Sequence, residues 1–256
     1  MLWTLAFWFL VFATGAAVGS FLNVVICRLP EGKSLIYPPS HCPACGGRLS
    51  WRDLVPVMSY FLLRGRCRRC GAAISAQYPL VELACGALFL AAVCVHGLSW
   101  EALRALLAVG ISVPATVIDL RHRIIPDRLN LAGLLLALPL AAWPPGRMND
   151  CLWGFLAGGG TLLAIALLSR GGIGGGDVKL AAVLGLILGL RLTAAALFLS
   201  FVAGSVAGLA LVAARKAGMK DAIPFGPFLG AGAVAASLFG ERLWSWYGGF
   251  WVWVVL

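Results

Sequence analysis

The sequence predicts an all-α, polytopic membrane protein with about eight transmembrane helices and a small cytoplasmic domain between the first and second helices. Three observations support this fold class. The 256 residues are 61% hydrophobic and only 12% charged, whereas a soluble domain is typically about 25% charged. Long apolar runs recur along most of the chain, and a single long polar stretch, 28–77, interrupts them.

The candidate spans are the runs that carry few or no charges. These eight runs cover about 3–26, 83–100, 105–118, 129–146, 151–169, 180–190, 192–214 and 222–240. No charged residue precedes Arg28. Because a secretory signal peptide needs a positive segment before its apolar run, we expect a retained first span whose N-terminus lies outside.

The basic residues test this topology, since Lys and Arg gather in cytoplasmic loops. Sixteen of the 20 basic residues fall in alternate gaps, which we therefore assign to the cytoplasm. These are Arg28, Lys33, Arg48, Arg52, Arg64, Arg66, Arg68, Arg69, Arg121, Arg123, Arg128, Arg170, Lys179, Arg215, Lys216 and Lys220. The other gaps hold Arg104, Arg147, Arg191 and Arg242. Both termini are then outside, and membrane topology rather than nucleic-acid binding explains the net charge of +10.

The polar stretch 28–77 contains two Cys-x-x-Cys pairs, each followed by glycine. Cys42 and Cys45 form the first pair, Cys67 and Cys70 the second, and 21 residues separate them. Four thiolates at this spacing can surround one Zn²⁺ tetrahedrally and leave no open position, so we expect a structural site. Disulfides are the alternative reading, but cytoplasmic thiols stay reduced. A metal would also help to fold a loop too small for a large core.

Two aspartates lie beside unusually short apolar runs. Arg104 and Asp119 enclose 14 residues, and Lys179 and Arg191 enclose 11. At about 1.5 Å per helical residue these runs reach only about 21 and 17 Å, less than the bilayer core of about 30 Å. We therefore expect neither run to span alone, and we expect Asp119 and Asp177 at the cytoplasmic boundary of the membrane.

The backbone near both aspartates is unusual. Pro114 precedes Asp119 by five residues and predicts a kinked helix there. The run from Gly171 to Gly176 precedes Asp177. It is too flexible for a helix interior and, apart from Ile173, has no side chains to hinder an approaching backbone, so an extended substrate could lie against it.

A carboxylate inside a bilayer helix costs roughly 2.5–3.5 kcal/mol and is normally paired, hydrated or catalytic. Asp119 and Asp177 could form a proteolytic pair that shares one proton, because like charges about 4 Å apart repel by roughly 4 kcal/mol at an effective dielectric constant of 20. Each could instead be a helix cap or an ion pair, with Arg121 or Lys179 respectively. Asp127 is a second candidate partner of Asp177, although its place after Pro126 is typical of a helix N-cap.

Seven segments of the chain resemble the type IV prepilin peptidases, which are bifunctional leader peptidases and N-methyltransferases. These segments are Gly19–Val25, the Cys42/Cys45/Cys67/Cys70 loop, Pro56–Cys67, Tyr78–Leu83, Asp119–Asp127, Gly174–Leu180 and Pro224–Leu229. The Gly-x-Gly-Asp element at 174–177 is also similar to that of presenilin and the archaeal preflagellin peptidases, which are intramembrane aspartyl proteases.

The resemblance implies that Asp119 and Asp177 carry hydrolysis, within an active-site loop that includes Gly174, Gly176 and Lys179. It implies that type IV prepilins and pseudopilins are the substrates and lose a basic leader at the cytoplasmic face of the bacterial inner membrane. S-adenosylmethionine would then methylate the new N-terminal residue. The implied domains are a first transmembrane helix (1–27), a zinc-binding, methyl-transferring domain (28–77) and a membrane peptidase domain (78–256).

One segment departs from the family. Members often have Asp-Asn-Ile-Pro where this chain has Asp53-Leu-Val-Pro56, which leaves a peptidase without methyl transfer as an alternative. No glycine-rich fingerprint marks a site for the methyl donor. In another functional class, membrane carboxylates also serve proton and ion transporters, so a carboxylate-dependent transporter is a further alternative.

Overall fold

A computed structural model describes residues 2–169, 172–215 and 223–255, with side chains through residue 245. Arg170, Gly171, Lys216 and Lys220 lie outside this range. The described chain is helical, and its regular elements include no strand. Two compact units, Met1–Gly97 (unit 1) and Leu98–Leu256 (unit 2), are described separately.

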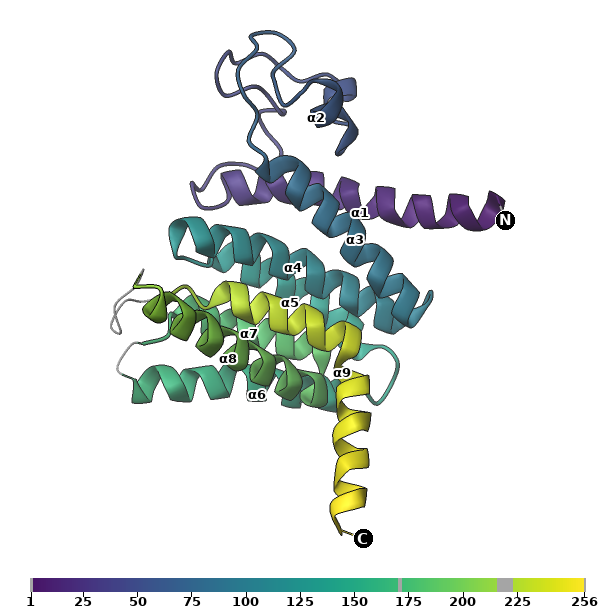
Figure 1. Cartoon of the computed structure of the whole chain (residues 1–256), viewed down its shortest axis with the longest axis vertical. Coiled ribbons are helices and arrows are strands. Elements are labelled where there is room, and N and C mark those ends of the chain that lie inside the picture. Colours follow the sequence, from purple (N-terminus) through teal and green to yellow (C-terminus); the bar gives the residue numbers. More distant parts are fainter. Residues whose placement is uncertain (1, 170–171, 216–222, 256) are drawn as a thin grey trace. The chain divides into compact units, whose positions relative to one another are not determined.

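Unit 1 contains a pair of long apolar helices, α1 (Leu2–Arg28) and α3 (Gln77–His96), that pack against each other (Figure 1). The chain between them forms the short helices η1 (Trp51–Asp53) and α2 (Met58–Leu62). Gly19 lets α1 approach α3 closely, since a Cβ there would lie 2.9 Å from the Cα of Glu82. The polar stretch predicted from the sequence is therefore tethered at both ends to one helix pair.

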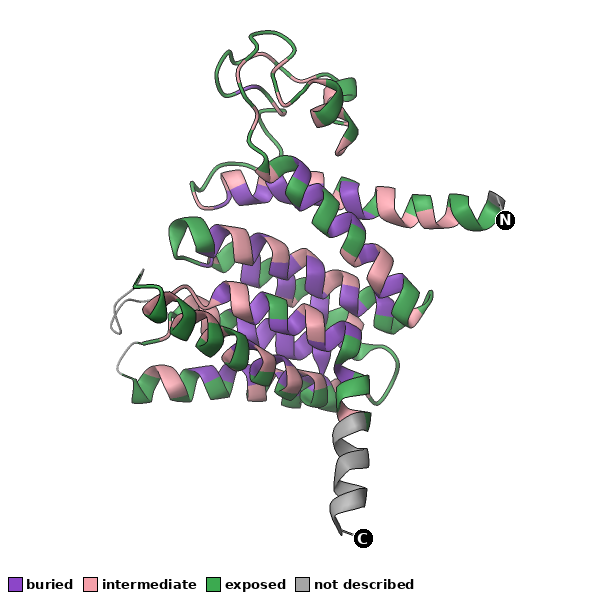
Figure 2. Cartoon of the chain, in the orientation of Figure 1, coloured by how far each residue is buried: buried purple, intermediate pink, exposed green. Residues whose placement is uncertain are grey.

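Unit 2 is built around α7, which contacts every other helix of the unit. Residues 180–188 of α7 are all buried, and Figure 2 shows this region as the main concentration of buried residues. Gly154 and Gly185 allow α6 to reach it, because a Cβ on Gly185 would lie 2.1 Å from the Gly154 carbonyl oxygen. The helices are α4 (Trp100–His122), α5 (Asp127–Ala142), α6 (Met148–Leu168), α7 (Gly175–Leu188), α8 (Leu190–Ala213) and α9 (Gly226–Val255).

Five helices of the described residues are long and apolar enough to cross a membrane, namely α1, α3, α4, α6 and α8. The all-helical membrane fold is therefore confirmed, but the count of eight spans is not. At about 1.5 Å per residue, α5 (16 residues) and α7 (14 residues) extend only about 24 and 21 Å. Helix α7, which contains the run after Asp177, is thus as short as the sequence predicted.

We expected the run before Asp119 to be too short to span the membrane, and this expectation was wrong. Helix α4 has 23 residues, or about 34 Å, because Arg104 and Asp119 lie inside the helix rather than at its ends. Pro114 also lies within this continuous helix. A buried arginine was not expected at position 104, which the charge pattern assigned to a loop.

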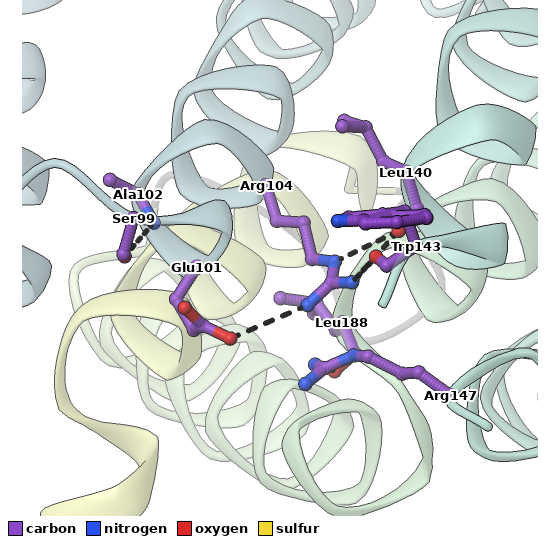
Figure 3. A network of polar contacts seen from close by, with 8 residues as sticks. All are labelled: Ser99, Glu101, Ala102, Arg104, Leu140, Trp143, Arg147 and Leu188. Atoms are coloured by element: carbon purple, nitrogen blue, oxygen red, sulfur yellow. Dashed lines mark hydrogen bonds and ion pairs between the residues drawn. The ribbon is translucent and has the colours of Figure 1, made fainter. Parts of the chain in front are cut away.

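Arg104 is only 4% exposed because its guanidinium caps another helix. It donates hydrogen bonds to the carbonyl oxygens of Leu140 (2.8 Å) and Trp143, at the C-terminal end of α5. Arg147 donates similarly to Leu188, at the end of α7, and Glu101 lies 3.7 Å from Arg104 (Figure 3). Carbonyls in the last turn of a helix lack partners within the helix, and the two arginines supply donors to them.

Replacing Arg104 by methionine should destabilise unit 2 by about 1–3 kcal/mol, because it removes the donors of partly buried carbonyl oxygens at the end of α5. Thermal unfolding of the purified protein in detergent measures this change. Arg242→Met, at an exposed position of α9, is the matched control. An equal loss of stability in both variants would show that the hydrogen bonds of Arg104 to the end of α5 do not stabilise unit 2.

Candidate active site and metal centre

Asp119 is buried in the last turn of α4, with 5% of its surface exposed. Its Oδ2 accepts a hydrogen bond of 2.9 Å from the backbone N–H of Gly226, the first residue of α9. Helix α4 ends soon afterwards at Arg123, which adopts a left-handed conformation (φ 54°). Asp119 thus has a backbone donor from a segment 107 residues away.

Asp177 lies in the first turn of α7, where it is half-buried. The helix begins at Gly175, so part of the glycine run that the sequence suggested was non-helical is helical. Gly176 packs closely on the segment before α5, since a Cβ there would lie 3.0 Å from the Cβ of Ile125. Within the described part of the chain, Asp177 Oδ1 is buried and has no hydrogen-bond partner.

The two aspartates lie in one compact unit, on helices that contact each other. Asp119 lies in the last turn of α4, and Asp177 lies in the first turn of α7. Neither has the competing ion pair considered from the sequence: Lys179 binds Asp127 instead of Asp177, and no ion pair between Asp119 and Arg121 occurs among the described residues. The arrangement is compatible with two carboxyl groups acting together.

Asp127 is not buried beside Asp177. Its side chain is 74% exposed, and its Oδ1 lies 2.7 Å from the Nζ of Lys179. Pro126 occupies the N-cap position of α5, so Asp127 is the first helical residue rather than the cap expected from the sequence. This exposed ion pair joins the starts of α5 and α7. Such pairs contribute about 0–1 kcal/mol to the free energy of unfolding.

The four cysteines of the Cys-x-x-Cys pairs come together in unit 1. Their sulfur atoms all lie within 4.8 Å of one another, and those of Cys42 and Cys70 are 3.8 Å apart. Four sulfurs held about 2.3 Å from a tetrahedral zinc lie about 3.8 Å from one another. The cluster can therefore hold a metal ion, as the sequence predicted.

The two cysteine pairs have the same local structure. In the first, the N–H of Gly46 donates to the Cys42 carbonyl, and in the second the N–H of Gly71 donates to the Cys67 carbonyl. Both glycines have positive φ angles (65° and 72°), which glycine adopts without strain. Backbone N–H groups of Cys70 and Arg69 lower the pKa of the Cys67 thiol to about 6, whereas burial and the neighbouring sulfurs raise the pKa of the Cys70 thiol to about 11. Cys67 is therefore the first of this pair to supply the thiolate that metals bind.

Glu82 has a role that the sequence did not indicate. Helix α3 begins at Gln77, so Glu82 is its sixth residue, and it is buried. Its Oε2 accepts the N–H of Val57 at 2.7 Å. Val57 is the centre of a γ-turn (φ 64°, ψ −56°), a strained conformation for a β-branched residue. Glu82 therefore fixes the polar loop to α3.

Asn130 is another residue of the candidate site that sequence reasoning missed. It is 5% exposed, and its amide nitrogen lies 3.5 Å from the carbonyl oxygen of Gly176. The available signal was its position three residues after Asp127, on the same helix face. Gly226 was noticed only within the resemblance at Pro224–Leu229, because nothing local to that segment indicates a contact with Asp119.

Comparisons with known proteins agree with this architecture. The model of the bacterial peptidase A24 N-terminal domain matches residues 13–96, and that of the type IV leader peptidase family matches residues 106–209. The two matches fall in unit 1 and unit 2 respectively. No solved structure gives a significant match.

Relatives similar to this chain include three proteins that are each named prepilin leader peptidase/N-methyltransferase. The one from Bacillus subtilis (strain 168) is 36% identical over 244 residues, covering 93% of this chain and 96% of the relative. The one from Myxococcus xanthus (strain DK1622) is 39% identical and covers 82% and 65%, respectively. The one from Aeromonas salmonicida (strain A449) is 35% identical and covers 93% and 92%.

Changing both Cys67 and Cys70 to serine should abolish metal binding, because two ligands cannot hold a tetrahedral ion tightly. Metal analysis of the purified protein should show about one equivalent of zinc in the wild type and none in this variant. Cys94→Ser, an exposed cysteine of α3, is the control and should keep the metal. Retention of a full equivalent by the double variant would mean that other residues bind it.

Proposed function

This chain belongs to the type IV leader peptidase family, and on that premise we propose that it is a prepilin leader peptidase that also methylates the product. The observation that carries the proposal is the relationship along 93% of the chain to a protein named for both activities. Two carboxyl groups buried or half-buried in one unit supply chemistry suited to the first.

Asp119 and Asp177 are the proposed catalytic residues. One carboxylate removes a proton from water, and the resulting hydroxide oxygen bonds to the carbonyl carbon of the scissile peptide. The other carboxyl group, protonated, gives its proton to the carbonyl oxygen. The first then passes its proton to the leaving nitrogen as the carbon–nitrogen bond breaks. The second takes a proton back from a hydroxyl group of the diol intermediate as the carbonyl re-forms. One water is consumed, and neither aspartate is changed.

The loop before Asp177 is the proposed place for the substrate backbone. Gly174 and Gly176 have no side chains, and a Cβ on Gly174 would lie 3.2 Å from Asp177 Oδ2. Lys179 holds the start of α7 to the start of α5 through Asp127. Because Gly176 is packed against Ile125, the proposed approach of an extended peptide to the Asp177 carboxyl group lies at Gly174, which is exposed.

The proposed substrates are type IV prepilins and pseudopilins, which lose a basic leader at the cytoplasmic face of the bacterial inner membrane. The enzyme is a multi-pass protein of that membrane, with both termini outside and the active site toward the cytoplasm. The grouping of 16 of 20 basic residues in alternate gaps supports this orientation. The lipid bilayer is its other partner.

Methyl transfer to the new N-terminus is proposed from the names of the relatives, with S-adenosylmethionine as the methyl donor. The domain at 28–77 is the proposed zinc-binding, methyl-transferring part. The first transmembrane helix (1–27) precedes it, and the peptidase domain (78–256) follows it. Cys42, Cys45, Cys67 and Cys70 would hold one structural Zn²⁺, and their sulfur geometry supports this ion. Zinc there would order the loop that Glu82 fixes to α3.

Replacing either Asp119 or Asp177 by asparagine should lower the rate of leader removal by at least about 100-fold, because asparagine can neither accept nor give the transferred proton. Cleavage of a purified prepilin in detergent measures the rate. Asp127→Asn is the discriminating comparison. It should lower the rate of leader removal by less than about tenfold, as expected for the loss of an exposed ion pair. Undiminished cleavage by Asp119→Asn or Asp177→Asn would refute the proposed role of that residue.

Mass spectrometry of the mature pilin tests the second activity. In the presence of S-adenosylmethionine, the wild-type product should gain the mass of one methyl group at its new N-terminus. Cys67→Ser/Cys70→Ser should still cleave but lose methylation, because the zinc loop and the aspartates lie in different units. A product that is cleaved but never methylated by the wild type would indicate a peptidase only.

A further inference from the structure

We propose that the backbone amide of Gly226 is a positioning group that holds Asp119 as the charged member of the aspartate pair, so that Asp119 is the base and Asp177 the acid. This inference rests on the proposed peptidase function and deepens it by dividing the two roles. It also makes the start of α9 part of the catalytic centre.

The first observation is the hydrogen bond itself. Gly226 N–H donates to Asp119 Oδ2 at 2.9 Å in a buried setting. Gly226 is the first residue of α9, and the N-terminal end of a helix carries a partial positive charge. A hydrogen bond from such an amide to a carboxylate is charge-assisted and stronger than a bond between neutral groups. The contact therefore favours the ionised form of Asp119.

The second observation is that no side chain fits at position 226. A Cβ there would lie 2.7 Å from Asp119 Oδ2 and 3.1 Å from Asp119 Cβ. One helical turn later, a Cβ on Gly230 would lie 2.7 Å from Thr116 Oγ1. Gly226 and Gly230 thus form a glycine face on which α4 lies close to α9, and this close approach brings the amide within hydrogen-bond distance.

The start of α9 is itself anchored. The Phe225 ring packs against that of Phe201 on α8, with the ring centroids 5.4 Å apart. The Phe225 carbonyl accepts the N–H groups of Phe228 and Leu229, both at 3.0 Å. This turn fixes the position of the Gly226 N–H, which donates to the carboxylate of Asp119.

Asp177 has a different environment. It lies in the first turn of α7, whose positive end also favours a carboxylate, but a helix end acts more weakly than a direct hydrogen bond to a charged group. Its Oδ1 is buried without a partner among the described residues, and the nearby Lys179 is engaged with Asp127. A protonated carboxyl group carries its own O–H donor, which can be directed to Asp119 or to a substrate carbonyl. Asp119 thus receives a hydrogen bond from a backbone amide, whereas Asp177 Oδ1 receives none. This difference makes the two carboxyl groups unequal and places the shared proton on Asp177.

Gly226→Ala tests the positioning role. Alanine keeps the N–H but places a methyl group against the Asp119 carboxylate, so kcat for leader cleavage should fall about 10- to 100-fold, the loss expected for a hydrogen bond to a charged group. KM should stay within about twofold, because substrate contacts are unchanged. Gly160→Ala on α6 is the matched control, since a Cβ there would meet no atom within 4 Å. A wild-type kcat in Gly226→Ala would overturn the proposal.

A second measurement keeps the test decisive if Gly226→Ala folds poorly. The chain contains two Phe-Gly pairs, 225–226 and 239–240, so labelling Phe carbonyl carbon and Gly nitrogen isolates two amide signals by nuclear magnetic resonance. The Gly226 proton should be shifted downfield in the wild type and in Asp177→Asn, and this shift should be lost in Asp119→Ala. Gly240 is the internal reference. An unchanged Gly226 signal in Asp119→Ala, or its loss in Asp177→Asn, would overturn the assignment.

The failure of this inference is distinguishable from that of the proposed function. If the wild type cleaves prepilin and both asparagine variants do not, the peptidase function stands whatever Gly226→Ala does. If the wild type does not cleave, the function falls, while the resonance test still reports whether Gly226 binds the Asp119 carboxylate.

Discussion

The burial of charged groups in an apolar protein is the constraint on which the structure depends. An unpaired charge in such surroundings is too costly to keep, so each must find a partner within the fold. Arg104 caps carbonyls of α5, Glu82 accepts the amide of Val57, and Asp119 accepts the amide of Gly226. In all three cases the partner is backbone from a distant segment, and each contact fixes a helix or a loop that would otherwise have only apolar packing to position it.

Small residues make these long-range contacts possible. In an apolar environment, helices associate by close packing rather than by removing apolar surface from water. Gly154 and Gly185 bring α6 onto α7, and Gly226 and Gly230 bring α9 onto α4. At these positions the glycine hydrogen occupies space that a methyl group could not enter. The same close approach that stabilises unit 2 delivers an amide to the Asp119 carboxylate.

Sequence reasoning predicted the features that depend on local pattern. Apolar runs predicted the helices, and the spacing of Cys42, Cys45, Cys67 and Cys70 predicted the cluster that can hold a metal. It failed where a polar residue is satisfied from far away. Arg104 was assigned to a loop, and the contact of Glu82 with the polar loop was not foreseen, because a charged residue in isolation gives no sign of a partner 36 or 25 positions distant. The catalytic roles of Asp119 and Asp177 stay a prediction from the sequence, now with defined surroundings.

The distance along the chain between Asp119 and Gly226 has a consequence for biosynthesis. A nascent chain that has inserted its helices through α8 already contains both carboxyl groups, but it lacks the amide that Asp119 Oδ2 accepts. The proposed proteolytic centre is then completed only when α9 docks against α4. During synthesis the two carboxyl groups therefore arrive before the group that, in the proposed arrangement, makes them unequal.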